Sequence, residues 1–149
     1  MATAPRTGPT LAVVRIAFGT DEQTAVSDHI EHWLADAGHE VVVPTERGSA
    51  WPDVGRTVGS AVAAGDVDCG VVCCWTGTGV SIAANKVPGV RAALCTDAAT
   101  AAGARRWNDA NVLAVGMRLT STEVAAEILA AFLDTDPDPH EADEVAKLE

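Results

Sequence analysis

Apolar runs alternate with helical patterns along most of this 149-residue chain, and no other feature restricts its fold as strongly. We expect strands at 11–18, 40–43, 68–73, 91–95 and 112–115. We expect helices at 22–37, 52–64, 79–85, 98–107 and 123–133. Strict alternation of strand and helix predicts a parallel sheet covered by helices on both faces. The fold should therefore be an α/β, Rossmann-like three-layer α/β/α sandwich with about five parallel strands.

The alternation also sets the expected domain limits. Residues 11–133 form the predicted α/β domain, whose last helix begins with a capping box from Thr120 and Glu123. Residues 1–10 hold no apolar run and are expected to be a flexible N-terminal tail, not a signal peptide. Residues 134–149 are acidic, contain two prolines and are expected to be an extended tail. No apolar run reaches the roughly 20 residues that span a bilayer.

The charge and the cysteines exclude several classes of partner and setting. The net charge is −11, which argues against nucleic acid and anionic membrane surfaces, because both reward positive charge. The four cysteines include no C-x-x-C pair and do not form a disulfide pattern, so a reduced, cytoplasmic setting is expected. Cys69, Cys73 and Cys95 are expected to be small buried apolar residues.

One segment, 73–86, carries most of the functional information. It passes from the end of an apolar run through a Gly/Thr loop into a helical pattern of small residues. This order directs backbone N–H groups and a helix N-terminus at one point, which can bind a phosphate or an oxyanion. Cys74 stands at the entrance to this loop. A helix N-terminus favours negative charge, so Cys74 is a candidate base or nucleophile.

Two other interpretations of the segment are weaker. A nucleotide-binding loop would need the full Gly-x-Gly-x-x-Gly pattern after the first strand, whereas these glycines follow the third. The chain shows no His, Cys and carboxylate spacing typical of a metal site. We therefore expect chemistry that needs no metal and no cofactor.

The segment is also one part of a longer motif that extends over much of the chain. Its parts are Ile16-Ala17-Phe18-Gly19-x-Asp21, Cys74-x-Thr76-Gly77-x-Gly79-x-Ser81-Ile82-Ala83-Ala84-Asn85-Lys86, Gly89-x-Arg91-Ala92-Ala93 and Asn108-Asp109-x-Asn111-Val112-Leu113-Ala114-x-Gly116-x-Arg118. This motif resembles the ribose-5-phosphate isomerase B family, which includes galactose-6-phosphate and allose-6-phosphate isomerases. The match is dense between residues 66 and 118.

The resemblance implies an aldose–ketose isomerase that moves a proton between C1 and C2 through a cis-enediol. In the family, the thiol at the position of Cys74 is the base, a hydroxyl at Thr76 assists it, and the loop amides at Gly77, Thr78 and Gly79 stabilise the enediolate. The residues expected to contact substrate are Asp21, Glu22, Trp75, Gly77, Thr78, Gly79, Trp107, Asn108 and Arg118. The family builds its site between two subunits, which implies a homodimer, or a tetramer, with a small sugar or sugar-like substrate as ligand.

Several positions depart from the family pattern. The family has a glycine where this chain has Trp75, a phosphate-binding histidine where it has Glu22, and a ring-opening histidine where it has Trp107. The family's Asp-Tyr-Pro becomes Ala50-Trp51-Pro52, and two phosphate-binding arginines align with Pro139 and Asp143. Each charge-assisted bond to phosphate is worth roughly 1.5–3 kcal/mol, so tight phosphate binding should be lost. An indole also cannot shuttle a proton near neutral pH.

These departures leave two hypotheses. In the first, the chain keeps the proton-transfer chemistry but acts on an altered substrate: an unphosphorylated sugar, an open-chain hydroxy-carbonyl compound, or one with a positive group facing Glu22. In the second, it is a non-catalytic paralogue or partner subunit that keeps only the fold and interface. The intact Cys74-x-Thr76-Gly77-x-Gly79 motif favours the enzyme. Trp107, Glu22 and Asp143 favour the partner subunit or a new substrate.

Overall fold

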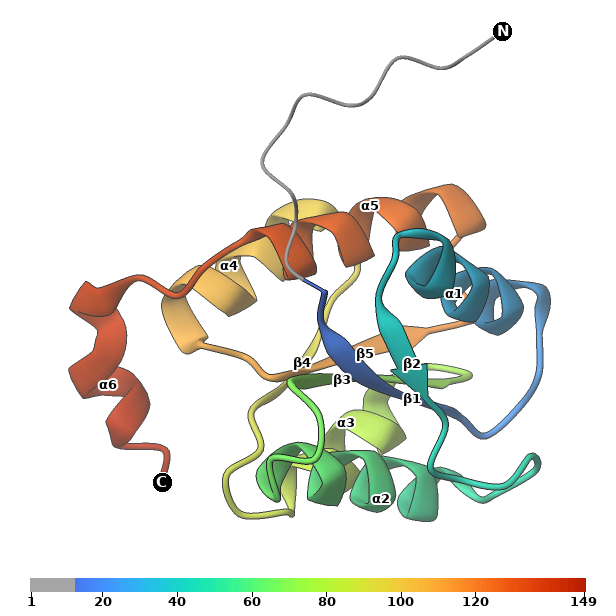
Figure 1. Ribbon diagram of the computed structural model, residues 1–149, viewed down its shortest axis with the longest axis horizontal. Helices are drawn as coiled ribbons and strands as arrows, with labels where there is room; N and C mark the ends of the chain where they lie inside the picture. Colours follow the sequence, from blue (N-terminus) through green and yellow to red (C-terminus); the bar gives the residue numbers. More distant parts are fainter. Residues whose placement is uncertain (1–12) are drawn as a thin grey trace, which may run out of the picture.

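Five parallel strands in the order β2-β1-β3-β5-β4 form the middle layer of the structure, a computed structural model that describes residues 13–149 (Figure 1). The strands are β1 Arg15–Thr20, β2 Glu40–Val42, β3 Cys69–Cys74, β4 Ala92–Leu94 and β5 Val112–Gly116. Every strand that the alternation predicted is present, and the prediction of a parallel sheet is confirmed.

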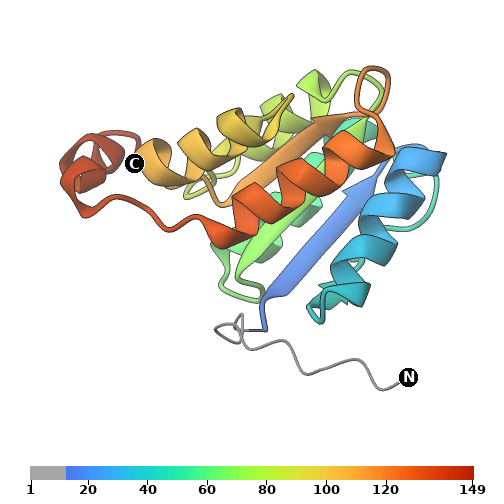
Figure 2. The same ribbon diagram turned by 90° about the horizontal axis from the view of Figure 1, so that it is seen from above.

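Helices cover both faces of this sheet, as Figures 1 and 2 show. On one face lie α1 Ala25–Asp36, α4 Ala98–Asn108 and α5 Thr122–Asp134, and on the other lie α2 Trp51–Ala63 and α3 Thr78–Asn85. The three-layer α/β/α sandwich is therefore confirmed. None of the helices within residues 13–149 is long and apolar enough to cross a membrane.

The central strand β3 shows how the core is divided between the two faces. All its residues are buried, and successive side chains point to opposite sides of the sheet. Cys69 and Cys73 enter the core beneath α1, α4 and α5, whereas Val72 and Cys74 enter the core above α2 and α3. The expected burial of Cys69, Cys73 and Cys95 is confirmed.

Helices α2 and α3 pack unusually closely because α2 presents glycines to its neighbour. A Cβ atom placed on Gly55 would lie 2.6 Å from Ala83 Cβ and 2.7 Å from the Val80 carbonyl oxygen. One turn later, a Cβ atom placed on Gly59 would lie 3.3 Å from its nearest neighbours, among them the Ala84 carbonyl oxygen, so the space there is less restricted. This contact fixes the position of α3, and with it the loop that follows β3.

Most element boundaries differ from the prediction by one to four residues, and two differences concern β1 and α5. β1 begins at Arg15 and ends at Thr20, later than the predicted 11–18, while residues 11 and 12 lie outside the described residues, as does the predicted tail 1–10. The predicted capping box from Thr120 is wrong. The N-cap of α5 is Ser121, whose hydroxyl accepts the Val124 N–H at 3.1 Å, while Thr120 is buried.

The segment after α5 is not extended throughout, contrary to expectation. It contains a 3₁₀ turn, η1 Pro139–Glu141, followed by a short helix, α6 Ala142–Ala146. The Asp138 N–H donates to the Arg106 carbonyl at 2.8 Å, and the Glu149 carboxylate lies 2.8 Å from the Arg91 guanidinium. These contacts hold the segment beside the C-terminal end of α4 (Figure 2).

The α2–α3 contact gives a direct test of packing. Gly55→Ala and Gly59→Ala should gain about the same helix propensity, up to ~1 kcal/mol, so their difference measures overpacking. We expect the free energy of unfolding of Gly55→Ala to lie about 1–3 kcal/mol below that of Gly59→Ala, because its new methyl group meets backbone atoms. Urea denaturation followed by circular dichroism measures both. Equal stabilities would contradict the close contact described here.

Candidate functional site

The ends of three strands meet at one edge of the sheet. Thr20 pairs with Cys73, and Cys74 pairs with Gly116, so the residues that follow β1, β3 and β5 lie side by side. The chain moves outward in opposite directions from β1 and β3, which makes the space between them the topological switch point of the sheet. Ligands of open parallel sheets bind in the crevice at this point. The structure therefore places Asp21 and Cys74 where a ligand is expected.

Cys74 is the last residue of β3, and its side chain is only 5% exposed. The backbone around it is tied to the end of β5: the Met117 N–H donates to the Cys74 carbonyl at 3.0 Å, and the Arg118 N–H donates to the Trp75 carbonyl at 2.8 Å. The thiol is thus held in a fixed place, largely shielded from solvent, at the carboxyl edge of the sheet.

The turn after Cys74 ends in a helix N-terminus that no side chain caps. Gly77 is the N-cap of α3, with a φ of 76° that only glycine adopts readily. The Ser81 N–H bonds to the Gly77 carbonyl at 3.3 Å, so the earlier amides of the first turn have no partner within the helix. The Thr76 and Thr78 hydroxyl oxygens lie 2.7 Å apart beside these amides. Such a group of free donors can stabilise a developing oxyanion.

Asp21 stands at the end of β1, beside the end of β3. Its N–H donates to the Cys73 carbonyl at 3.4 Å. Its Oδ1 is buried and has no hydrogen-bond partner among the residues that the structure describes. Burial raises the pKa of this carboxyl group above its ordinary value, and the nearby Glu22 carboxylate adds to the rise. An unpartnered carboxylate oxygen is suited to accept a hydrogen bond from a ligand hydroxyl.

The structure brings together only part of the predicted set. All at the carboxyl edge, at the ends of β1, β3 and β5, in the loops that follow them or in the first turn of α3, lie Asp21, Glu22, Cys74, Trp75, Thr76, Gly77, Thr78, Gly79 and Arg118. Trp107 and Asn108 lie elsewhere, at the C-terminal end of α4. Because α4 runs back antiparallel to the strands, this end reaches the opposite edge of the sheet (Figure 2). Trp107 folds over Gly103 and remains 55% exposed.

The C-terminal segment shares this second location. Pro139 and Asp143 belong to η1 and α6, which lie beyond the end of α4 in Figure 2. The positions aligned with the family's ring-opening histidine and two phosphate-binding arginines therefore lie together at one edge, while Cys74 and Glu22 lie at the other.

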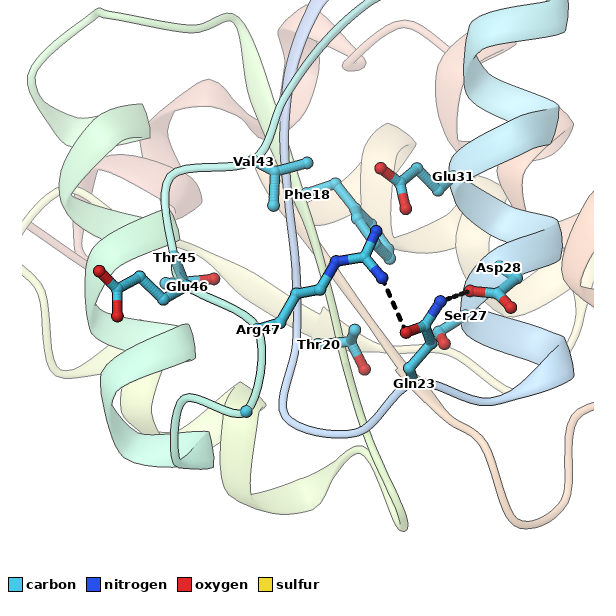
Figure 3. A pocket seen from close by; sticks show the side chains of 11 residues that line it. Phe18, Thr20, Gln23, Ser27, Asp28, Glu31, Val43, Thr45, Glu46 and Arg47 are labelled. Atoms are coloured by element: carbon cyan, nitrogen blue, oxygen red, sulfur yellow. Dashed lines mark hydrogen bonds between the residues drawn. The ribbon is translucent and has the colours of Figure 1, made fainter.

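A cavity of about 260 Å³ lies beside the carboxyl edge, between β1, α1 and the loop at 43–48 (Figure 3). Arg47 donates to Gln23 Oε1 at 2.9 Å, and Gln23 donates in turn to Asp28 Oδ1 at 3.0 Å. The carboxylates that line the cavity come from Asp28, Glu31 and Glu46, and they outnumber the single arginine. Arg47 was not among the predicted residues, because it lies in an irregular loop without a motif.

Comparisons with known proteins agree with this architecture. The sequence profile of the family described as Ribose/Galactose Isomerase matches residues 16–148. Ribose-5-phosphate isomerase B of Escherichia coli is 41% identical over 124 residues, which cover 80% of this chain and 83% of that protein. D-erythrulose-4-phosphate isomerase of Pectobacterium atrosepticum is 35% identical over 129 residues, covering 83% of this chain and 85% of that protein.

The similarity extends to the three-dimensional structure. Ribose-5-phosphate isomerase B of Clostridium thermocellum superposes with a TM-score of 0.84 at 37% identity, over 90% of this chain and 94% of that one. The profile match covers nearly all of the described sheet and helices, including the Cys74 turn and the C-terminal segment. The expectation of an isomerase is confirmed at the level of the family: this chain belongs to the ribose/galactose isomerase family.

Proposed function

We propose that this chain is an aldose–ketose isomerase that transfers a proton between C1 and C2 of an open-chain sugar, with Cys74 as the base. The observation that carries the proposal is the largely buried thiol at the end of β3, directly before the uncapped N-terminus of α3. A base beside an oxyanion site is the minimum that enolisation next to a carbonyl requires. Membership of an isomerase family supports the same reaction.

The proposal gives each neighbour of the thiol a role. As a thiolate, Cys74 accepts a proton from the carbon next to the carbonyl and returns it to the former carbonyl carbon, while the hydroxyl proton on the first of these carbons moves to the former carbonyl oxygen. The first-turn amides of α3 stabilise the negative oxygen of the cis-enediolate. The Thr76–Thr78 hydroxyl pair and the unpartnered Asp21 oxygen lie where they can exchange hydrogen bonds with sugar hydroxyls.

The complete site is proposed to form in a homodimer. Trp107, Asn108 and the C-terminal segment cannot reach Cys74 of their own chain, because the length of the sheet separates them. A second copy that presents its α4 end to the first would complete two sites at once, since contacts are reciprocal in a two-fold dimer. We propose the cytoplasm as its setting, supported by four cysteines that all remain free.

The substrate is proposed to be short and open-chain. The position that resembles the ring-opening histidine holds Trp107, whose indole cannot transfer a proton near neutral pH. One relative is named for D-erythrulose 4-phosphate. A four-carbon sugar whose O4 carries a phosphate cannot close a furanose ring through that oxygen, so its isomerisation needs no ring opening. We therefore favour a four-carbon hydroxy-carbonyl compound.

Phosphate is proposed to contribute little to affinity, even where a phosphate on O4 prevents ring closure. Glu22 lies exposed directly after β1, where a phosphate would meet its negative charge. The residues that line the nearby cavity include Asp28, Glu31 and Glu46 but only one cation, Arg47. Among the residues predicted to contact substrate, Arg118 is the one cation that the structure places at this edge. Ribose 5-phosphate should therefore bind weakly.

Cys74→Ala tests the base directly. We expect the rate of proton exchange between substrate and D2O, followed by proton NMR with erythrulose 4-phosphate, to fall by about 10²–10⁴. The matched control is Cys73→Ala, which removes the adjacent thiol on the other face of β3 and should keep most of the activity. Near-normal turnover in Cys74→Ala would rule out this base. A wild-type chain inactive on tetrose, pentose and hexose substrates would favour the non-catalytic partner subunit instead.

The raised pKa of Asp21 predicts a specific pH dependence of stability. Between the unfolded value of 3.8 and the higher native pKa, the folded state binds more protons, so it loses stability as pH rises through this window. Asp21→Asn has no group that titrates here and removes that loss. The free energy of unfolding of the variant minus that of wild type should therefore increase as the pH is raised from below 3.8 to neutral. Denaturant titrations at several pH values measure the difference.

Asp97→Ala is the control of opposite sign. The Thr100 N–H donates to the Asp97 carboxylate at 2.7 Å and lowers its pKa, so this carboxylate stabilises the fold at neutral pH, and its contribution fades in acid. The cost of Asp97→Ala should therefore shrink as pH falls. The same trend in both variants would contradict the assigned environment of Asp21.

Trp107→His tests whether the lack of a ring-opening histidine restricts the chain to open-chain substrates. An imidazole at this position can shuttle protons near neutral pH, so conversion of ribose 5-phosphate should rise relative to that of erythrulose 4-phosphate. Trp107→Phe removes the indole without supplying a titratable group and should give no such rise. Steady-state kcat/KM for both substrates is the measurement. Sub-millimolar, efficient use of ribose 5-phosphate by the wild-type chain would overturn both the ring-opening and the phosphate arguments.

A further inference from the structure

The indole of Trp51 lies directly against the first turn of α3. A Cβ atom placed on Gly79 would be 2.8 Å from Cε3, 3.0 Å from Cδ2 and 3.3 Å from Cζ3 of Trp51. All three atoms belong to the six-membered ring, so this ring covers the Cα of Gly79. The contact exists only because Gly79 has no side chain.

Trp51 is held in this place by the start of α2, not by a loose loop. The N-cap Ala50 has extended backbone, Trp51 is the first residue of the helix, and Pro52 follows within its first turn. The close α2–α3 contact at Gly55 fixes the two helices relative to one another. The indole is therefore a rigid side wall of the turn at Gly77–Gly79.

The rest of the Trp51 side chain is open to a ligand. Trp51 is 45% exposed, and Trp75, in the loop that leads to the same turn, is 53% exposed. Large aromatic side chains half open to solvent beside uncapped amides are suited to contact a substrate that binds to those amides. An apolar wall also excludes water from the amides, which strengthens their interaction with a negative oxygen.

From this geometry we propose that Trp51 positions the Gly77–Gly79 turn and limits the length of the substrate that reaches Cys74. The inference deepens the proposed function and rests on it. The six-membered ring on Gly79 holds the amides in place, and the exposed part of the indole narrows the space left for carbons beyond the reacting pair. Trp51 touches no reacting atom in this assignment, so it is a positioning and specificity residue, not a base or acid.

Substrate selectivity is the first test. Trp51→Phe keeps an aromatic ring at the start of α2 but shortens it. We expect kcat for erythrulose 4-phosphate to stay within about threefold of the wild-type value. The ratio of kcat/KM for ribose 5-phosphate to kcat/KM for erythrulose 4-phosphate should rise by about tenfold. Trp51→Ala should lose the positioning as well, with a fall in kcat of about 10–10². Trp33→Phe, in α1 on the other face of the sheet, is the control and should change neither substrate.

The second test does not depend on isomerase activity. Because the turn shields Cys74, its alkylation by iodoacetamide in the folded protein should be about 10 times faster in Trp51→Ala than in wild type or Trp51→Phe, as measured by peptide mass spectrometry. Circular dichroism verifies that each variant is folded. An unchanged alkylation rate together with unchanged selectivity would overturn the inference.

A double-mutant cycle isolates the ring–glycine contact. Gly79→Ala places a methyl group against the Trp51 ring and should destabilise the protein. Adding Trp51→Ala removes the collision, so the double variant should be more stable than the two single effects predict. Additive effects would show that the contact does not fix the turn. If the wild-type chain isomerises nothing, the proposed function fails, whereas alkylation and the cycle still decide the positioning role.

Discussion

The close backbone contact between the turn after β3 and the end of β5 is the constraint on which the rest of the site depends. A Cβ on Gly116 would lie 2.6 Å from the Thr76 carbonyl oxygen, and a Cβ on Gly77 would lie 2.8 Å from the Gly116 nitrogen. Neither position can hold a larger residue without moving the backbone. The Met117 and Arg118 amides add hydrogen bonds across the same junction. Cys74, the turn and the loop after β5 therefore form one rigid unit.

The second constraint is the packing of α3 on α2. Gly55 lets the helices approach, and Gly79 lets Trp51 cover the first turn. The amides at this N-terminus have no capping side chain, so a ligand is the remaining way to satisfy them away from water. In the proposed reaction, the polar groups come from the backbone and from Cys74, Thr76 and Asp21, while Trp51 and Trp75 supply aromatic surface beside them.

The fold was largely predictable from the sequence. The alternation of apolar and helical segments was sufficient for the parallel sheet, because a strand buried on both faces and an amphipathic helix have different periods. The errors fell at the ends of elements. Thr120 fits the capping box because Glu123 follows it by three residues, but in the structure Thr120 is buried and the Ser121 hydroxyl accepts the Val124 N–H instead. The C-terminal segment was predicted as extended, because its acidic composition does not reveal the contacts of Asp138 with Arg106 and of Glu149 with Arg91.

The sequence by itself determined the family, the layered fold and the local order of thiol, glycine turn and helix, because each depends on residues close together in the chain. Tertiary structure decided which of the predicted residues lie together. It separated Trp107 and the C-terminal segment from Cys74, and it placed Trp51 on Gly79 and Arg47 beside Gln23. These contacts join residues that are distant in the chain, and their positions follow from strand order and helix packing, which no local pattern encodes.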